Sequence, residues 1–286
     1  MIIKFNTLVS AIAVSLAGWA VPAHAFLLDW KLGFDGTGNI STATPINDFL
    51  DVVGPSVITT TAPDAAGTFS FNERGAMNVV GHDGGVAFAG GTQVAAVLDA
   101  IAGSATLGGA ITYNSGSINV YFNPVQTFAT AGGTYGVDPS GAMLIGTFNI
   151  ASGIGSLGLV GVPNVQQTLF AQATHLAAGF WWDSVGNDLS TSVGGTRPVF
   201  GFARTDASLI IPAAPLVVSE LGGGSVTNCL PGLAGGACTG TGNFETFNNG
   251  QFRLNEVSEP GTLALFGIAI AGLGFLRCFK TEEAAA

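Results

Sequence analysis

Apolar and polar residues alternate over short stretches along most of the chain between residues 26 and 256. In residues 117–122, Ile118, Val120 and Phe122 fall on one face of an extended chain, with other residue types on the opposite face. A period of two is typical of β-strands. Further strand candidates cover residues 68–71, 110–113, 143–150, 179–182, 198–203, 208–211, 216–218 and 251–257. The pattern therefore predicts a domain built of short strands.

Glycine and small polar residues separate these stretches about every ten residues, a spacing that is typical of strands and turns in a β-sandwich. Asn114-Ser115-Gly116 is one such separator and predicts a hairpin turn. We find no internal repeat of about 20–50 residues, which argues against a solenoid or propeller. We therefore predict a mainly β fold: a single β-sandwich-like domain over residues 26–256, with at most one short helix.

The helix candidate lies at residues 92–101. Val94, Val97, Leu98 and Ile101 recur there at helical spacing, and Thr92 stands at the start of the segment. This spacing places apolar side chains on one face of a helix. Residues 166–178 fit a helix and a strand equally well.

The N-terminus has the pattern of a secretory signal peptide. Lys4 provides a positive start, residues 8–17 form an apolar run, and Ala-His-Ala at 23–25 is a small-x-small cleavage site. We expect signal peptidase to cut between Ala25 and Phe26 after export through the Sec translocon. A retained membrane helix is the alternative, but the run is short and leads directly to the cleavage site. Residues 1–25 are therefore predicted to be removed.

The C-terminal tail consists of a short motif, an apolar run and two cations. The motif residues are Val257, Ser258, Glu259, Pro260 and Gly261. Residues 262–276 carry no charge, and Arg277 and Lys280 follow them. An apolar helix followed by cations enters a bilayer with the cations on the cytoplasmic side. Residues 257–286 therefore predict a C-terminal transmembrane helix with a short basic end.

This order of motif, apolar run and cations resembles the PEP-CTERM sorting signal. The resemblance implies recognition of Glu259 and Pro260 by exosortase, a membrane transpeptidase-like enzyme, with Arg277 and Lys280 as retention charges. Ser258 stands where the family motif has its first proline. An ordinary C-terminal membrane anchor is the alternative.

The family is associated with exopolysaccharide, biofilms and flocs, and the body of the chain is similar to its flocculation-associated members. The resemblance therefore implies transient anchoring in the inner membrane, followed by release to the cell surface or extracellular matrix. Extracellular polysaccharide is the implied partner.

Charge narrows the choice of partners. The chain carries a formal net charge of −10, and 9% of its residues are charged. The cations between residues 26 and 258 are Lys31, Arg74, Arg197, Arg204 and Arg253. So few scattered cations do not neutralise a run of phosphates, so nucleic-acid binding is disfavoured.

Cysteine placement predicts one disulfide. Cys229 and Cys238 flank a glycine- and proline-rich segment of the exported part. An oxidising compartment lets such a pair close its loop, and two free thiols are the alternative. No histidine or second cysteine pair lies near them in the sequence, so a metal site is disfavoured.

Two acidic turns offer oxygen ligands for calcium. Their candidate ligands are Asp35, Asn39, Asp183, Asn187 and Asp188. Carboxylate and amide oxygens suit this hard cation, but neither turn matches the EF-hand pattern. Asp, Asn and Gly form turns without any metal. We therefore predict no metal or cofactor, with calcium as the weaker alternative.

Trp181 and Trp182 beside the second turn are candidates for a sugar-binding platform. Neighbouring residues of a strand point to opposite faces, so at most one of the two rings is expected at the surface.

Catalytic motifs are scarce. His82 stands in a Gly-His-Asp-Gly-Gly turn, and no G-x-S-x-G elbow is present. The glycines at 153–158 match G-x-G-x-x-G, but a glycine-rich chain produces that match by chance. We therefore predict a non-enzymatic surface or matrix protein. The alternatives are a carbohydrate-binding module, a secreted hydrolase and an outer-membrane barrel.

Overall fold

The computed structural model describes residues 25–26, 29–34, 38–88, 94–106, 108–122, 142–157, 164–195, 199–210, 217, 221 and 242–256. One compact unit spans Phe26–Glu256, and Met1–Ala25 with Val257–Ala286 make up the other.

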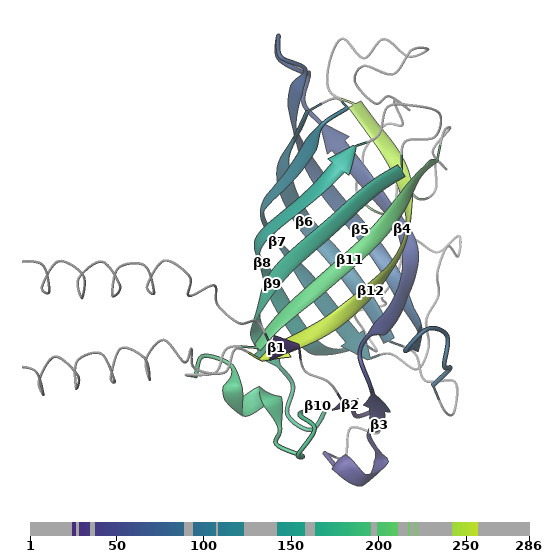
Figure 1. Cartoon of the computed structure of the whole chain (residues 1–286), viewed down its shortest axis with the longest axis vertical. Coiled ribbons are helices and arrows are strands. Elements are labelled where there is room, and N and C mark those ends of the chain that lie inside the picture. Colours follow the sequence, from purple (N-terminus) through teal and green to yellow (C-terminus); the bar gives the residue numbers. More distant parts are fainter. Residues whose placement is uncertain are drawn as a thin grey trace, which may run out of the picture. The chain divides into compact units, whose positions relative to one another are not determined.

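Eight long antiparallel strands form a closed barrel in this unit (Figure 1). They are β4 (Leu50–Thr60), β5 (Thr68–His82), β6 (Val94–Thr106), β7 (Ala110–Phe122), β8 (Met143–Leu157), β9 (Asn164–Leu176), β11 (Val199–Ile210) and β12 (Gly242–Glu256). β12 pairs with β4 from Gly242–Thr60 to Phe252–Leu50, which closes the sheet. The short strand β1 (Ala25–Phe26) follows β12 in the strand order. The predicted sandwich was wrong, because one sheet closes on itself.

Glycines inside the strands explain much of this error. A Cβ on Gly201 would lie 2.6 Å from the Phe252 ring, and one on Gly103 would lie 2.8 Å from the Phe71 ring. Both glycines therefore make room for aromatic rings inside the barrel. They stand within strands, although glycine was interpreted as a separator between strands.

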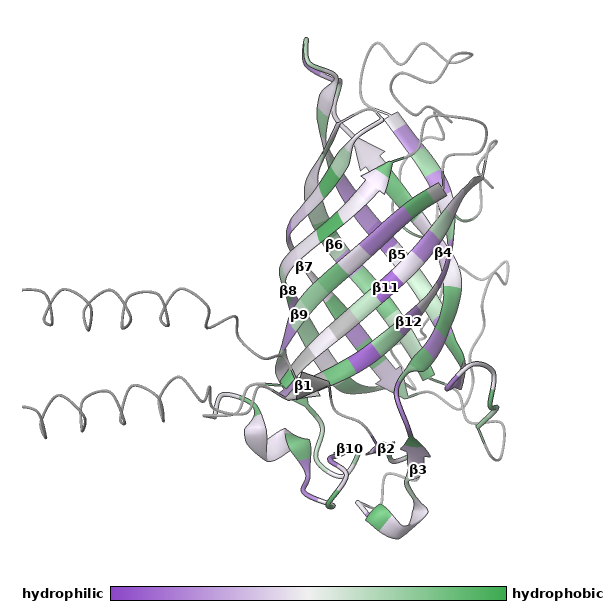
Figure 2. Ribbon diagram, in the orientation of Figure 1, coloured by the Kyte–Doolittle hydropathy of each residue, from purple (hydrophilic) through white to green (hydrophobic). Residues whose placement is uncertain are grey.

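Hydrophobic and hydrophilic residues alternate along most strands (Figure 2). The buried residues of these strands are mostly apolar, which places the apolar side chains inside the barrel. On β12, Phe252 and Leu254 are buried, whereas Asn249 is exposed and Gln251 is partly exposed. The same alternation packs one apolar core within the barrel.

The described part of the predicted helix at residues 92–101, from Val94 onward, belongs to strand β6. Val94 and Leu98 are buried in the core, and the register against β5 then shifts between Leu98 and Ile101. Ala100, inside this bulge, has a φ of +49°. One extra residue moves the next inward side chain to Ile101, so a bulged strand reproduces helical spacing. Residues 166–178, left open between helix and strand, belong largely to β9.

The predicted hairpin at Asn114–Gly116 was also wrong, because these residues lie inside β7. They stand opposite the β6 bulge, where the pairing of the two strands is irregular. Gly116 has a φ of +120°, and a Cβ there would lie 2.5 Å from the Cα of Ile101. Only glycine fits this close approach without strain.

A small second sheet packs beneath one end of the barrel (Figure 1). Its strands are β10 (Trp181–Trp182), β2 (Trp30–Leu32) and β3 (Thr44–Ile46), in that order. The Trp30 and Trp181 rings stack with their centroids 5.8 Å apart, and the Phe148 ring meets Trp181 edge-on at 5.9 Å. Short 3-10 turns, η1 (Ile40–Thr42) and η3 (Leu189–Ser192), flank the sheet. Aromatic packing therefore links this sheet to the barrel core.

The transmembrane helix predicted for the C-terminal tail is not found in the part of the chain that the structure describes. Among the residues that the structure describes, no helix is long and apolar enough to cross a membrane. The apolar run at 262–276 lies outside those residues.

Candidate functional site

A row of hydrogen-bonded polar side chains crosses the barrel interior. The Tyr113 hydroxyl donates to Oε1 of Gln167, whose amide nitrogen donates to Oδ1 of Asn248 at 3.4 Å. The Asn248 amide donates to Ser56 Oγ at 2.9 Å, and Ser56 Oγ donates to Glu73 Oε1 at 2.7 Å. The row joins β7, β9, β12, β4 and β5. Every bond in it points toward the Glu73 carboxyl.

The strand register brings these residues together. Ser56 on β4 stands directly opposite Thr246 on β12, and their hydroxyl oxygens lie 2.7 Å apart. Asn248 is two residues further along β12, on the same inward face. Inward polar residues of neighbouring strands therefore share one level of the barrel.

Glu73 is the least usual member of the row. Its side chain is 1% exposed, and its Oε2 atom has no hydrogen-bond partner among the described residues. Burial raises the pKa of its carboxyl, and the hydrogen bond from Ser56 opposes that shift only in part. Burial and the nearby Glu73 also raise the pKa of Tyr113 well above its usual value. The position of Glu73 inside the barrel therefore disfavours the charged form of its carboxyl.

A small apolar cavity lies next to this row of polar side chains. A cavity of about 20 Å³ opens near the Ile58 and Tyr113 side chains, and Ile58 is the cross-strand partner of Glu73. The other lining residues are Phe69, Phe71, Ala105, Ile111, Leu157, Val165 and Phe244. This volume is of the order that one water molecule needs. The interior is therefore a packed core with a polar centre.

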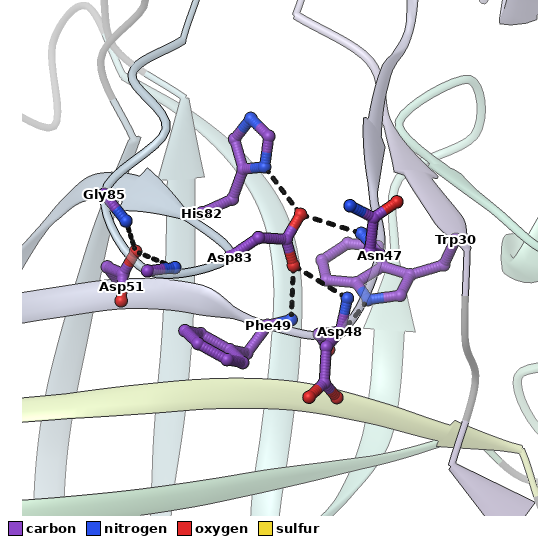
Figure 3. Close-up of polar contacts among 9 residues, drawn as sticks. Trp30, Asn47, Asp48, Phe49, Asp51, His82, Asp83 and Gly85 are labelled. Carbon is purple, nitrogen blue, oxygen red and sulfur yellow. Dashed lines mark hydrogen bonds and ion pairs between the residues drawn. The ribbon is translucent and has the colours of Figure 1, made fainter.

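A second polar cluster joins the chain before β4 to the turn after β5 (Figure 3). The Asp83 carboxylate accepts backbone N–H bonds from Asn47, Asp48 and Phe49 at 2.8–3.2 Å. In return, Asp51 Oδ2 accepts the N–H groups of Gly84 and Gly85 at 3.1 and 2.9 Å. Each side chain thus satisfies the backbone of the other segment, and together they clamp this corner.

His82, the histidine considered for chemistry, belongs to this clamp. Its Nδ1 lies 2.8 Å from Asp83 Oδ2 (Figure 3), and its ring lies beside Phe88 at 5.2 Å. Slight burial tends to raise the pKa of Asp83, but the bonds from His82 and the three N–H groups outweigh it and lower that pKa. The geometry supports a structural role for this pair.

Trp181 and Trp182 differ in burial, as expected for neighbouring residues of a strand, whose side chains point to opposite faces. Trp181 is fully buried, and its indole N–H donates to the Ile145 carbonyl at 2.6 Å. Trp182 is partly buried and pairs with Lys31. Trp181 is therefore a core residue with no surface to offer to a sugar.

The second calcium candidate is a hydrogen-bonded turn. Asp183 accepts the backbone N–H groups of Val185 and Asn187, and its other oxygen accepts the Asn187 side-chain amide. Asp188 caps η3 through Ser190 and accepts the N–H of Gly179 at 2.7 Å. These oxygens already satisfy backbone donors.

The first calcium candidate is described only in part. Asn39 caps η1 by accepting from Ser41, and Asp35 lies outside the described residues. In the described part of the chain, no group of three or more His, Cys, Asp or Glu is placed to hold a metal ion. The prediction that no metal binds, and calcium binding as its weaker alternative, both stay untested.

Most of the predicted processing residues cannot be placed. Ala25 and Phe26 form β1. The sorting motif (Val257, Ser258, Glu259, Pro260 and Gly261), Arg277, Lys280, Cys229 and Cys238 lie outside the described residues.

Sequence reasoning missed Glu73, Asp83 and Asp51. Of these, only Glu73 could have been found from the sequence, because it is an acid at an inward position of the alternating run that begins at residue 68.

Comparisons with protein-family models, curated proteins and solved structures give no match for this chain.

Proposed function

We propose that the chain is an exported, non-enzymatic protein of the cell surface or extracellular matrix, sorted through its C-terminal motif by an exosortase-like enzyme. After export the tail holds it at the inner membrane, and cleavage near Glu259 and Pro260 releases it. Extracellular polysaccharide is its proposed surrounding.

The position of the last strand carries this proposal. β12 ends at Glu256, and the motif begins at Val257. Every residue that pairs with β12 in the ladders with β4 and β11 lies between Leu50 and Ile210. Removal of the tail after β12 therefore takes no pairing residue from the barrel, so the released chain keeps its sheet.

The closed sheet suits an extracellular structural role. Each of the eight barrel strands has a partner on both sides, because β12 and β4 pair with each other. An open sheet presents unpaired N–H and C=O groups that recruit other chains, and closure removes those edges. Buried or clamped carboxyls such as Glu73, Asp83 and Asp183 serve the fold, which supports a non-enzymatic role.

Intact mass and cell fractionation of the protein from its native host test the proposal. With exosortase-like activity present, we expect a species that starts at Phe26, ends within residues 258–261 and appears outside the inner membrane. Without that activity, the tail stays attached.

Two variants separate the motif from general charge effects. Glu259→Gln is expected to block processing, whereas Glu283→Gln, which removes a carboxylate beyond the cations, is expected to leave it unchanged. If the tail remains attached in cells with and without the activity, the sorting proposal is wrong.

A further inference from the structure

We propose that a polar depression on the outer face of β4, β12 and β11 is a binding site for a neutral sugar chain. Its volume is about 250 Å³, just below the range of about 300–1,000 Å³ that is usual for pockets of small ligands. The lining residues are Asp51, Arg204, Asp206, Asn249, Gly250 and Gln251.

The register arranges the polar side chains in two rows across three strands. Gln251 on β12 stands between Asp51 on β4 and Arg204 on β11. One step along, Asn249 stands beside Asp206. Because alternate residues share a face, the rows lie side by side on the outside of the barrel.

These groups are available to a ligand. Arg204, Asp206 and Asn249 are exposed, and none of the three side chains makes a hydrogen bond or ion pair with another residue that the structure describes. Asp51 uses only Oδ2 for Gly84 and Gly85, which leaves Oδ1 open. A guanidinium therefore lies near two carboxylates without pairing with either.

The mixture of donors and acceptors fits hydroxyl groups. A hydroxyl donates one hydrogen bond and accepts others, so it uses carboxylate, amide and guanidinium partners together. Vicinal hydroxyls of a sugar present two such groups at neighbouring positions. The planar side chains of Asn249 and Arg204 offer paired atoms at matching spacing, whereas Gln251 Oε1 already accepts a hydrogen bond from Arg253 at 3.2 Å.

An exposed aromatic ring extends the site. Phe247 is 43% exposed and lies two residues from Asn249, on the same outward face of β12. The C–H face of a sugar ring packs on such a ring and removes apolar surface from water.

Charge favours a neutral ligand over an acidic one. Asp51 and Asp206 outnumber Arg204 in the depression, and the whole chain has a net charge of −10. An anionic sugar would therefore meet net repulsion. The inference rests on the proposed surface or matrix location, which would expose the depression to extracellular polysaccharide.

Saturation-transfer NMR on the purified full chain tests the site. The probes are maltohexaose, cellohexaose and mannohexaose, with an alginate oligomer as the acidic probe. We expect transfer to at least one neutral hexasaccharide and none to alginate. Asn249→Ala and Arg204→Ala should each weaken that binding about tenfold, the effect of one lost hydrogen bond to a ligand.

Asn149→Ala is the matched control, because Asn149 is also an exposed asparagine, on β8. It should bind as tightly as the unmodified chain. Absence of transfer to all neutral probes, or an equal loss in Asn149→Ala, would overturn the inference. Because purified protein is used, a failure here leaves the sorting proposal standing, and a failure of sorting leaves binding intact.

Discussion

Ser56 donates a 2.7 Å hydrogen bond to Glu73 in the interior of the barrel, and the other carboxyl oxygen of Glu73 has no hydrogen-bond partner in the described part of the chain. The only basic residue among the buried residues that the structure describes is His82, which is bonded to Asp83. An acid in these surroundings is stable when it is protonated, which gives it a defined effect on the free energy of unfolding.

Glu73→Gln is expected to make stability less dependent on pH. The folded-state pKa of Glu73 is raised above its unfolded value, so its stabilising contribution is complete below the unfolded pKa and is lost as pH rises through the folded pKa. The variant cannot ionise, so it should match the native chain near pH 4 and exceed it at pH 8.

Urea unfolding across that pH range measures the difference. Each unit of pKa shift corresponds to about 1.4 kcal/mol. Asp99→Asn removes an exposed carboxylate from β6 and serves as the control. An unchanged pH slope in Glu73→Gln would contradict the raised pKa of Glu73.

Asp83→Asn is expected to weaken the clamp, because a neutral amide accepts the three N–H groups and His82 less well. A loss of about 1–3 kcal/mol in the free energy of unfolding at pH 7 is expected. The pKa of Asp83 is lowered in the folded state, so its contribution is present above the unfolded pKa and is lost as pH falls through the folded pKa. The difference from the native chain should therefore shrink in acid.

Thermal and urea unfolding of Asp29→Asn provide the comparison. Asp29 has a φ of +59° and Asp83 one of +51°, so both substitutions keep a residue type that tolerates this conformation. Equal losses in the two variants would show that the clamp bonds are not the cause.

Trp181→Phe and Trp182→Phe should differ. The first substitution removes the indole donor bonded to the Ile145 carbonyl, whereas the Trp182 indole nitrogen has no hydrogen-bond partner in the described structure. We expect Trp181→Phe to cost about 1–3 kcal/mol more than Trp182→Phe. Chemical unfolding followed by circular dichroism measures both, and the reverse order would refute this view of the end sheet.

Gly201→Ala is expected to destabilise the barrel by about 1–3 kcal/mol, because its methyl group would overlap the Phe252 ring. Gly109→Ala is the matched control, since its nearest neighbours lie 3.4 Å from the added carbon, an ordinary contact. Calorimetric melting temperatures should fall for the first variant and change little for the second. Equal melting temperatures would show that the interior tolerates the added methyl group.

The sequence supported the strand content of the domain better than its architecture. Alternation in residues 117–122 correctly predicted an extended chain, but closure depends on pairing between β4 and β12, which are distant in sequence. Local patterns carry no signal for such a partner. The β6 bulge imitated a helix at Val94, Leu98 and Ile101 for the same reason, since spacing alone does not report register.

The candidate sites could not be predicted from the sequence either, because they depend on strand register and on contacts between distant segments. Asp51 and Asp83 stand in different segments, and only the fold shows that each caps the backbone of the other. Asn249, Gln251 and Arg204 each look like an ordinary outward residue of a strand. The register alone places them around one depression.

The pairing of β4 with β12 also governs how the chain reaches its native state. Ser56 and Thr246 are 190 residues apart in sequence, yet they meet side by side. Contacts of such long range carry a large loop-closure cost and slow folding. Synthesis starts at the N-terminus, so the sheet is incomplete until β12 has been made. Until then, β4 and β11 each lack the strand that pairs with them on one side. The unpaired edge of β4 is therefore open to aggregation between the synthesis of β4 and that of β12. A chaperone that covers β4 would have its greatest effect on the yield of folded protein in this interval.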